Sequence, residues 1–367
     1  MKIGVLTSSR ADYGIYLPLL NKIKKDNFFE LEIIAFGTHL SRSHGYTLKD
    51  IEKDNYNCIH TISSLISDDS EESIASSYGL TVLKFSDFWE IHKYDLVFCL
   101  GDRFEMSAAI QAGIPFGVKF AHLHGGEITL GAIDNIYRHQ ITLASTLHFT
   151  AVDIFTQKVC RLIDSSQNVF TTGSLSLNDI KSFIPIEKQA FFEKFGIPEE
   201  GFILVTFHSE TMSSQDNFQY AEEMKKALKK LSEKTFIVIT MPNADTQGSI
   251  YREAVEKLKL EVPDRILLIE NFGKTNYFSA MYYASILLGN TSSGILEAAS
   301  FGKYVVNVGD RQKGRAQSKN IINCEFEEKA IISSVRKAIE FKVYKGENIY
   351  FKLDAADNII KIIKQFS

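Results

Sequence analysis

The chain of 367 residues is 45% apolar and 23% charged, which is the composition of an ordinary globular protein. Its formal net charge of −4 excludes a general attraction to nucleic acid or to an anionic membrane, so an anionic ligand needs a local binding site. The first residues are too few and too quickly polar for a signal peptide, and no run of 18 apolar residues is present. We therefore expect a cytoplasmic protein of two domains.

Short runs rich in β-branched and aromatic residues alternate with amphipathic helical stretches along most of the chain. The first series of predicted strands comprises Lys2–Ser9, Leu31–Gly37, Asn57–Ile62, Tyr94–Gly101, Phe116–His122, Leu147–Ala151 and Val169–Gly173. The second series comprises Phe202–His208, Phe236–Met241, Ile266–Ile269, Ile286–Gly289 and Tyr304–Val308. Nearly continuous Val, Ile and Leu runs that are divided by helices predict parallel sheets covered on both faces.

The alternation is interrupted near Ser174–Pro198, where two prolines and a charged helix intervene. We predict an α/β fold of two doubly wound Rossmann-like domains, over residues 1–173 and 174–350. The last stretch, 351–367, has the apolar spacing of a helix and is expected to pack back on the domains. Ligands of open parallel sheets bind outside the carboxyl ends of the strands, so we expect the site in a cleft between the two domains.

The four cysteines are widely separated and form no CxxC pair. Three of them lie in or beside apolar runs, which favours buried free thiols. The cysteines are Cys58, Cys99, Cys160 and Cys324.

A serine-rich helix start follows the fourth strand of the second series. Ser292, Ser293 and Gly294 would place backbone N–H groups and two hydroxyls at the positive end of a helix, which attracts an anion. Taken alone, these residues also fit an ordinary serine N-cap. Glu297, one turn later, suits a ribose diol, and Arg311 follows the next strand. Together these side chains indicate a site for a nucleotide diphosphate.

Two further side chains are candidates for the same ligand. His208 ends the first strand of the second series, where it could donate a hydrogen bond to a phosphate or serve as a structural histidine. Arg10 follows the first strand of the chain, where a solvated surface arginine is the alternative. Neither GxGxxG nor GxxxxGK[ST] is present, so a nicotinamide cofactor or ATP hydrolysis loses its usual support.

The stretch 122–139, HLHGGEITLGAIDNIYRH, carries too many polar groups for a plain connection. Asp102, Glu127 and Asp134 are carboxylates that could converge, and crowding together with desolvation separates the pKa values of such groups. Acid–base chemistry is the better-supported interpretation. Two structural alternatives stay open, because Asp102 could cap a helix and Asp134 could pair with Arg138 four residues on.

The same stretch also contains side chains of the types that bind metals. Because no HExxH spacing is present, zinc is the weaker alternative and we expect no metal. The side chains concerned are His122, His124, Glu127 and Asp134.

A set of motifs, in this order along the chain, resembles those of the hydrolysing UDP-N-acetylglucosamine 2-epimerases: SSRADYG, LGDR, HLHGGE with IDNIYRH, FHSET, PNADTQGS, GNTSSG and VGDRQKGR. The resemblance covers nearly the whole chain. It implies a GT-B fold of two domains, a UDP-sugar substrate, no redox cofactor and a role in sialic acid biosynthesis. We also expect a homodimer or homotetramer, with neither nucleic acid nor a membrane as a partner.

The resemblance also implies roles for individual residues. The UDP-binding positions are Arg10, Asn243, Ser292, Ser293, Gly294, Glu297 and Arg311, with His208 beside the diphosphate. The catalytic stretches contain Asp102, His124, Glu127 and Asp134, and the positions near the sugar are His39, Arg103 and Arg138. One departure concerns His124, which stands where many relatives have a glutamate. Which of the four catalytic candidates removes the C2 proton therefore stays open.

Epimerisation at C2 constrains the mechanism that the resemblance implies. Because the C2 hydrogen is only weakly acidic, we expect UDP to leave C1 as the C2 proton is removed, which gives a 2-acetamidoglucal. Water then adds at C1 and a proton returns to the other face of C2, which yields N-acetylmannosamine. A UDP-2,4-diacetamido-2,4,6-trideoxyglucose substrate of the legionaminic acid route, a GT-B glycosyltransferase and a non-catalytic nucleotide-sugar sensor remain alternatives.

Overall fold

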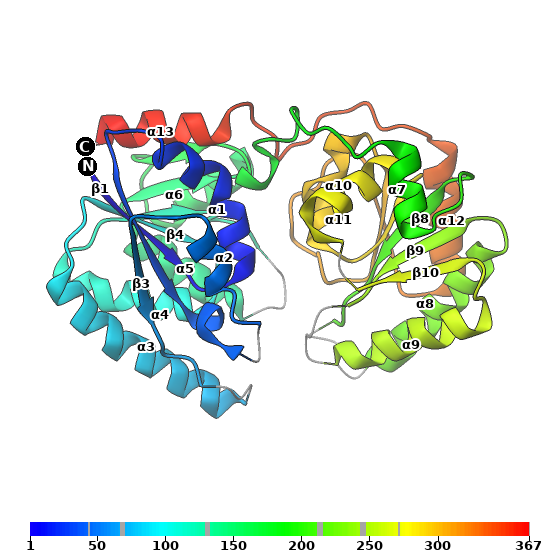
Figure 1. Cartoon of the computed structure of the whole chain (residues 1–367), viewed down its shortest axis with the longest axis horizontal. Coiled ribbons are helices and arrows are strands. Elements are labelled where there is room, and N and C mark those ends of the chain that lie inside the picture. Colours follow the sequence, from blue (N-terminus) through cyan, green and yellow to red (C-terminus); the bar gives the residue numbers. More distant parts are fainter. Residues whose placement is uncertain are drawn as a thin grey trace. The chain divides into compact units, whose positions relative to one another are not determined.

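The computed structural model describes residues 1–42, 45–66, 70–128, 133–210, 216–242, 247–270 and 272–366. Within them the chain forms two compact units (Figure 1). The first unit contains residues 1–128, residues 133–179 and the end of the chain from residue 350, and the second contains residues 180–349.

The first unit is built on a seven-stranded parallel sheet with the order β3-β2-β1-β4-β5-β6-β7. Its strands are β1 (Lys2–Thr7), β2 (Glu30–Phe36), β3 (Cys58–Ile62), β4 (Leu96–Leu100), β5 (Phe120–Leu123), β6 (Leu147–Thr150) and β7 (Val169–Thr171). Its α-helices are α1 (Arg10–Ile23), α2 (Leu48–Lys53), α3 (Glu71–Ile91), α4 (Phe104–Gly113), α5 (Asp134–Ala144), α6 (Asp153–Leu162) and α13 (Ala355–Phe366). Its 3-10 turns include η1 (Gly37–Leu40), η3 (Ile114–Phe116) and η4 (Leu175–Leu177).

The second unit is built on a six-stranded parallel sheet with the order β10-β9-β8-β11-β12-β13. Its strands are β8 (Phe202–Thr206), β9 (Phe236–Thr240), β10 (Ile266–Ile269), β11 (Leu287–Gly289), β12 (Val305–Val308) and β13 (Ile321–Cys324). Its helices are α7 (Lys188–Phe195), α8 (Asn217–Ser232), α9 (Gly248–Glu261), α10 (Gly273–Tyr283), α11 (Ser292–Leu296), α12 (Glu328–Glu340) and the 3-10 turn η6 (Ala298–Phe301).

Helices cover both faces of the first sheet. Consecutive residues of a strand point to opposite faces, so each strand contributes side chains to both apolar layers. Phe98 and Leu100 of β4 belong to the apolar layer under α1, whereas Val97 and Cys99 belong to the layer under α3 and α4. All four side chains are buried. Two such layers explain why the strands read as continuous hydrophobic runs, and the second sheet has the same two-sided core.

The last helix, α13, packs against α1 of the first unit, so that both ends of the chain belong to this unit (Figure 1). Its Ile359 and Ile363 are fully buried there. An ion pair of 2.9 Å between Lys22 Nζ and Asp357 Oδ1 joins the two helices at the surface. The apolar side chains of α13 lie along one face, which is what such packing requires.

Both sheets reverse their strand order at the first strand, since β1 lies between β2 and β4 and β8 lies between β9 and β11. This is the doubly wound order, and two Rossmann-like units are what a GT-B fold contains, so the predicted fold class is confirmed. All twelve predicted strands are present. The prediction Phe116–His122 began too early, because a 3-10 turn that contains Pro115 and ends at Gly117, with φ 65°, precedes β5.

The cysteines are less buried than the sequence predicts. All four cysteines are free, but only Cys99 is buried, whereas Cys58, Cys160 and Cys324 are half-buried, so the prediction of burial was right for Cys99 alone. Among the described helices, none combines the length and the apolar character that a membrane span requires.

Candidate active site

Most of the predicted site residues in the described part of the chain follow the carboxyl ends of strands, where ligands of doubly wound sheets bind. In the first unit, loops that follow β1, β2, β4 and β5 carry them, and in the second unit they follow β8, β11 and β12.

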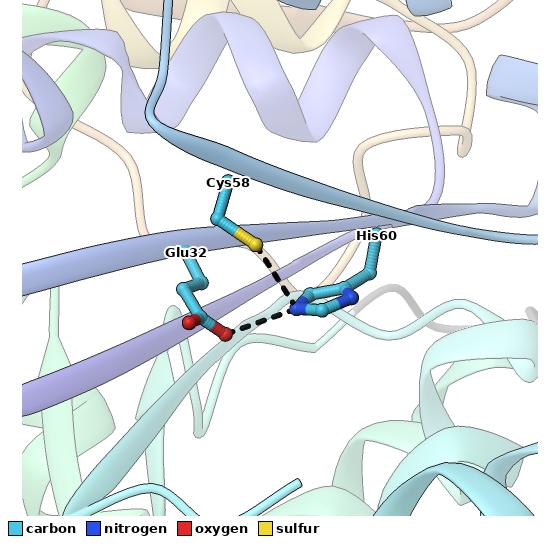
Figure 2. Close-up of side chains that lie close together, drawn as sticks. All are labelled: Glu32, Cys58 and His60. Carbon is cyan, nitrogen blue, oxygen red and sulfur yellow. Dashed lines mark hydrogen bonds and ion pairs between the residues drawn. The ribbon is translucent and has the colours of Figure 1, made fainter.

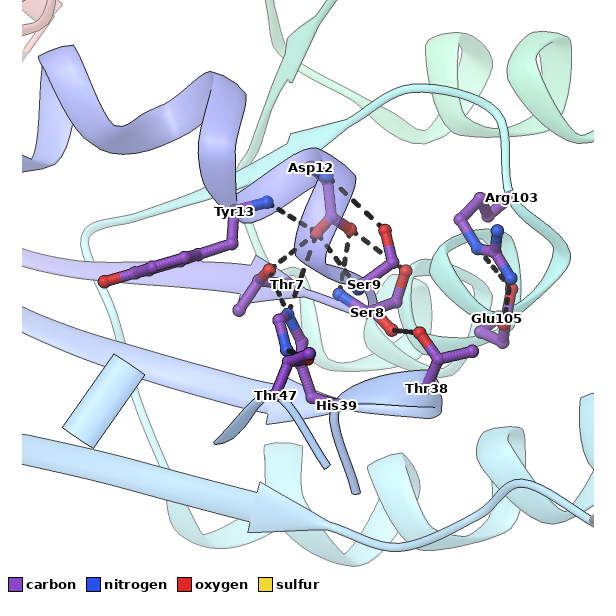
Figure 3. A network of polar contacts seen from close by, with 10 residues as sticks. All are labelled: Thr7, Ser8, Ser9, Asp12, Tyr13, Thr38, His39, Thr47, Arg103 and Glu105. Atoms are coloured by element: carbon purple, nitrogen blue, oxygen red, sulfur yellow. Dashed lines mark hydrogen bonds and ion pairs between the residues drawn. The ribbon is translucent and has the colours of Figure 1, made fainter. Parts of the chain in front are cut away.

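The loop between β1 and α1 is fixed by the carboxylate of Asp12, which was not among the predicted site residues (Figure 3). Ser9 is the N-cap of α1, and Asp12 Oδ1 accepts a hydrogen bond from the Ser9 backbone N–H at 3.0 Å, which completes a capping box. The other oxygen of Asp12 accepts the backbone N–H of Ser8 at 2.9 Å. Arg10, the first residue of α1, is exposed at the end of this rigid loop.

His39 joins the same network from the turn after β2 (Figure 3). Its Nε2 lies 2.9 Å from Thr7 Oγ1, and its Nδ1 lies 2.7 Å from Thr47 Oγ1. The ring is fully buried, and this burial lowers the pKa of His39, so the ring stays neutral near pH 7. A neutral, fully buried ring fits a role in holding the loop better than direct contact with a sugar.

Arg103, which follows β4, is exposed, and its guanidinium donates two hydrogen bonds to Glu105 (Figure 3). The Arg103 Nη2 to Glu105 Oε1 distance is 2.8 Å, and Glu105 is buried. The bidentate contact fixes the direction of the arginine.

Asp102 and Arg138 form an ion pair that joins the end of β4 to α5. The Arg138 guanidinium is buried, and it also donates to the Glu127 carbonyl at 2.6 Å and to Asn135 Oδ1 at 3.0 Å. Arg103 and not Asp102 is the N-cap of α4, so the capping alternative for Asp102 was wrong. Arg138 pairs with Asp102 and not with Asp134 in the structure, so Asp134 retains its carboxyl for other contacts.

His124 and Glu127 form a second pair, with 2.7 Å between His124 Nδ1 and Glu127 Oε1. The backbone of His124 has φ 65°, which turns the chain sharply after β5. Gly126 is also in the left-handed region, with φ 78°, and a Cβ there would lie 2.5 Å from the Phe155 carbonyl oxygen. Only glycine therefore fits at position 126, in the turn that brings His124 and Glu127 together.

Asp134 begins α5, where burial and then the nearby Asp102 carboxylate raise its pKa above the ordinary range. It therefore holds its proton to a higher pH than a solvated aspartate does. The first unit thus contains a carboxylate fixed by a buried arginine, a histidine–glutamate pair and a carboxyl that is protonated more readily. Such an arrangement can remove a proton at one place and supply one at another.

The structure removes His122 from the zinc alternative for this stretch. His122 is fully buried, with Nε2 3.0 Å from the Gly101 carbonyl oxygen and Nδ1 3.1 Å from Thr142 Oγ1, so both ring nitrogens are occupied. Burial lowers the pKa of His122 to about 3. Among the described residues, the group able to hold a metal ion lies elsewhere and does not include His122, His124 or Asp134.

In the second unit, α11 begins at Ser292 after the N-cap Thr291, whose hydroxyl accepts the Ser293 backbone N–H. The predicted helix body continues only as the 3-10 turn η6, so α11 has five residues and a small dipole. Any anion bound here would depend on individual N–H and hydroxyl groups. Gly294 is buried, and a Cβ there would approach Val305 Cγ1 to 3.1 Å.

Glu297 is hydrogen-bonded to the helix start, because Ser293 Oγ donates to its Oε2 at 2.5 Å. Burial raises the pKa of Glu297 above the ordinary range. Tyr277 of α10 lies beside this pair, and burial raises the pKa of Tyr277 to about 12, so its phenol is protonated and can donate a hydrogen bond. A carboxyl, a hydroxyl and a phenol are thus gathered at the carboxyl end of β11.

Asn290 holds His208 by its backbone. Asn290 Oδ1 accepts the His208 N–H and Asn290 Nδ2 donates to the His208 carbonyl, both at 2.8 Å. Asn290 is fully buried and its own carbonyl accepts Gln312 Nε2 at 2.8 Å. Through its side chain and its backbone carbonyl, Asn290 therefore connects the segments that follow β8, β11 and β12.

Glu210 holds Arg311 in a similar way. Its Oε1 accepts the backbone N–H groups of Asp310 and Arg311 at 2.7 and 3.1 Å. Arg311 Nε in turn donates to the Ser209 carbonyl at 3.3 Å. The segments that follow β8 and β12 are thereby held together at the carboxyl ends of these strands.

The sequence prediction assigned no role to four residues on which this geometry depends: Asp12, Glu210, Tyr277 and Asn290. Asp12, Glu210 and Asn290 lie inside the motifs SSRADYG, FHSET and GNTSSG. The spacing from Ser9 to Asp12 is a helix-capping signal that could have revealed Asp12. Tyr277 lies outside the motifs and carried no such signal. The predicted Asn243 is outside the described residues.

Two doubly wound sheets, with polar groups at their carboxyl ends, place the chain in the class of Rossmann-like α/β proteins. The family model of the UDP-N-acetylglucosamine 2-epimerases matches residues 21–364. The chain belongs to this family of enzymes.

Two relatives and one solved structure illustrate the similarity. The chain is 32% identical over 369 residues to polysialic acid biosynthesis protein P7 of Escherichia coli, which covers 100% of this chain and 94% of that protein. It is 33% identical over 347 residues to the hydrolysing GDP/UDP-N,N'-diacetylbacillosamine 2-epimerase of Campylobacter jejuni, covering 94% and 88% of the two chains. The fold matches UDP-GlcNAc 2-epimerase from Neisseria meningitidis bound to UDP-GlcNAc, with a TM-score of 0.82 at 17% identity over 100% of both chains.

Proposed function

We propose that the chain is a hydrolysing UDP-N-acetylglucosamine 2-epimerase, which produces N-acetylmannosamine and UDP for sialic acid biosynthesis. The observation that carries this proposal is the acid–base group of the first unit, in which Asp102 is fixed by buried Arg138, Glu127 is paired with His124, and the pKa of Asp134 is raised. A protein that only sensed nucleotide sugars would have no use for such a group. The family membership of the chain supports the same reaction type.

The second unit is proposed to bind the UDP part of the substrate. Ser292, Ser293 and Gly294 would offer donors to the diphosphate, and Glu297 would accept the ribose hydroxyls once it is ionised. The locks formed by Asn290 and Glu210 support this, because they fix the backbone of His208 and Arg311 before the ligand arrives. Preorganised donors stabilise the negative charge that develops on the leaving diphosphate. Arg10, Asn243, Arg103 and His39 remain proposed contacts or supports of the same substrate.

The reaction is proposed to proceed by elimination and then hydration. A base takes the proton from C2, the C2–H electron pair forms the C1–C2 double bond, and the C1–O bond breaks with its electrons leaving on UDP. Water then adds its oxygen to C1 of the glucal, and an acid delivers a proton to the opposite face of C2. The balance is one UDP-sugar and one water in, one N-acetylmannosamine and one UDP out.

The pairings in the first unit suggest how the two proton transfers are divided. Asp134 is a candidate acid, because its raised pKa favours the protonated form. The His124–Glu127 pair is a candidate base, because a proton taken by the imidazole would be stabilised by the carboxylate at 2.7 Å. Asp102 would then orient Arg138 and hold the positive charge of its guanidinium in place. No step requires a cofactor.

The test is turnover with UDP-N-acetylglucosamine and no acceptor. We expect the purified chain to produce equal amounts of UDP and N-acetylmannosamine. Chromatography of the reaction mixture measures both products. A glycosyltransferase would release UDP slowly and give N-acetylglucosamine, and a sensor would bind the nucleotide sugar without product. Either of these results would contradict the proposal.

A second substrate has specific support, because the Campylobacter relative named above is a hydrolysing diacetylbacillosamine 2-epimerase. The alternative substrate is UDP-2,4-diacetamido-2,4,6-trideoxyglucose, which differs at C4 and C6 and undergoes the same chemistry at C1 and C2. Parallel assays at equal enzyme concentration decide between them by kcat/KM. Turnover of the diacetamido sugar alone would retain the mechanism and replace the substrate.

A further inference from the structure

Glu32, Cys58 and His60 form a cluster that the proposed reaction does not use (Figure 2). Glu32 is in β2 and the other two residues are in β3, a strand at the end of the strand order of the first sheet. Glu32 and Cys58 are paired across the two strands, and His60 follows Cys58 by two residues. All three side chains therefore lie on one face of the sheet. Glu32 and Cys58 lie near the amino ends of their strands, away from the carboxyl-end loops of the candidate active site.

The polar atoms of the cluster converge on one point. His60 Nε2 lies 3.3 Å from Cys58 Sγ and 3.0 Å from Glu32 Oε2 (Figure 2). The three ligand atoms all lie within 4.8 Å of one another. A tetrahedral Zn²⁺ ion holds sulfur at about 2.3 Å and nitrogen or oxygen at about 2.0–2.2 Å, so its ligand atoms are separated by a similar spacing of roughly 3–4 Å.

A nucleophilic Cys–His–Glu relay does not explain this arrangement. In such a relay the thiol and the carboxylate bind opposite nitrogens of the imidazole, whereas here both approach the same nitrogen, Nε2. Burial and the Glu32 charge also raise the pKa of Cys58, so without a cation the sulfur is a thiol. Convergence on one nitrogen is the geometry of ligands around a common centre.

The surroundings keep the carboxylate ionised and the imidazole oriented. Burial alone would raise the pKa of Glu32, but hydrogen bonds from Lys2, Tyr94 and His60 lower it to about 2. Lys2 Nζ lies 2.8 Å from Oε1, whereas Oε2 accepts the Tyr94 hydroxyl at 2.7 Å and lies 3.0 Å from His60 Nε2. The Phe88 ring meets the His60 ring edge-on, with centroids 5.2 Å apart.

We propose that Cys58, His60 and Glu32 form a binding site for a thiophilic divalent cation of the Zn²⁺ class, with water as the fourth ligand. Cysteine sulfur, imidazole nitrogen and carboxylate oxygen are the ligand types that Zn²⁺ prefers. Binding displaces the Cys58 thiol proton to solvent, and the Nε2 proton is exchanged through solvent for one on Nδ1, so that the Nε2 lone pair binds the metal. The His60 side chain is 21% exposed, so the ion can enter from solvent. The site joins β2 to β3 and would stabilise this side of the sheet without entering the reaction.

The test uses Co²⁺ as a spectroscopic probe on the metal-stripped full chain. We expect one Co²⁺ per chain with a thiolate-to-cobalt charge-transfer band in the near ultraviolet. Cys58→Ser should abolish the band and weaken Co²⁺ binding at least about tenfold, since one of the ligands is lost. Cys160→Ser is the matched control, because Cys160 is also half-buried and is outside the ligand group, and it should leave the band unchanged. The rate of UDP release by Cys58→Ser should remain that of the wild-type chain.

A second measurement uses only the wild-type chain, so it does not depend on whether a variant folds. Zn²⁺ should protect Cys58 of the wild-type chain from alkylation by iodoacetamide, as read by mass spectrometry, and leave Cys160 unprotected. The proposal is overturned if wild-type protein gives no charge-transfer band, if the band persists in Cys58→Ser, or if Zn²⁺ protects both thiols equally. Loss of UDP release in all samples would instead concern the proposed function, because the two readouts are independent.

Discussion

At the level of single side chains, the buried guanidinium of Arg138 determines how the polar groups of the first unit share charge. It fixes Asp102 through an ion pair and the Glu127 backbone through its carbonyl, while the Glu127 carboxylate pairs with His124. The carboxylates therefore differ in their surroundings although both follow neighbouring strands, Asp102 after β4 and Glu127 after β5. That difference is what acid–base chemistry needs from chemically similar groups.

Glu127→Gln tests the proton chemistry with little change of shape, because the amide oxygen can still accept a hydrogen bond from His124. We expect kcat to fall by about 10²–10⁴, the range for general acid–base catalysis, while KM changes little. Stopped assays of UDP release measure both constants, and thermal melting checks the fold. Glu52→Gln, at an exposed position of α2, is the control and should keep wild-type turnover. If Glu127→Gln retained wild-type turnover, Glu127 would have a structural role.

Glu297→Gln should affect stability and UDP affinity in opposite directions. Because the folded state raises the pKa of Glu297, its stabilising contribution is present below the unfolded pKa and is lost as pH rises through the folded pKa. The glutamine variant lacks this loss, so its melting temperature relative to wild type should increase between pH 4 and pH 7. UDP binding at pH 7 should weaken by about 1–3 kcal/mol in calorimetry, since the charged acceptor of the ribose is removed.

Exposed Glu253 of α9 provides the control, because Glu253→Gln should change neither quantity. Unchanged UDP affinity in Glu297→Gln would remove Glu297 from the binding site.

The sequence was sufficient to find most of the polar residues of the site, but their partners were harder to predict. Residues that follow buried strands in an α/β pattern must lie at one edge of a sheet, which is why Asp102 and His208 were identified. Spacing along a helix suggested that Arg138 pairs with Asp134, whereas the structure pairs it with Asp102, which follows β4. Local spacing carries no information about a partner 36 residues away.

At the level of secondary structure, hydrophobic runs in the sequence predicted strands β1 to β12 but missed β13. Its burial is only partial, since it lies at the end of the strand order of the second sheet, and its sequence IINC includes a polar residue. The helix after β11 was predicted as one continuous element and is instead a short α-helix followed by a 3-10 turn. Its residues are mostly apolar, so periodicity gave no sign of the change in winding.

Gly289→Ala tests how closely β11 approaches β8. Gly289 has φ 143°, and a Cβ there would lie 1.8 Å from the Thr206 carbonyl oxygen, so the strand must shift to admit a methyl group. We expect a loss of at least about 2 kcal/mol of unfolding free energy and weaker UDP binding, measured by urea unfolding and calorimetry. Gly14→Ala in α1, where a Cβ meets nothing within 4 Å, should instead stabilise by about 0.5–1 kcal/mol. Equal stability of the two variants would contradict the clash.

At the level of the whole molecule, the two units differ in their histidines. Eight of the nine histidines are in the first unit's sequence, and the second unit contains only His208. Burial lowers the pKa of His122 to about 3 and that of His148 to about 4, and it also lowers the pKa of His39. Each of these rings is neutral when folded and would take up a proton when unfolded.

The first unit should therefore unfold first on acidification. A histidine with a lowered folded pKa contributes stability that is complete above its unfolded pKa of about 6.5 and is lost as pH falls towards the folded value. Trp89, the single tryptophan, is fully buried in the first unit, so its fluorescence should report a transition between about pH 6 and pH 4. Hydrogen exchange in peptides from β8 and β11 should remain slow over that range. Faster exchange there before Trp89 responds would contradict this account.

The central claim concerns the fate of the hydrogen at C2, and proton NMR of the reaction in heavy water tests it directly. If UDP is eliminated before water adds, the proton returned to C2 comes from an enzyme acid that exchanges with solvent. The account predicts N-acetylmannosamine that carries deuterium at C2, formed together with UDP. N-acetylmannosamine with protium retained at C2 would contradict elimination, and N-acetylglucosamine as the first product would contradict the assignment as an epimerase.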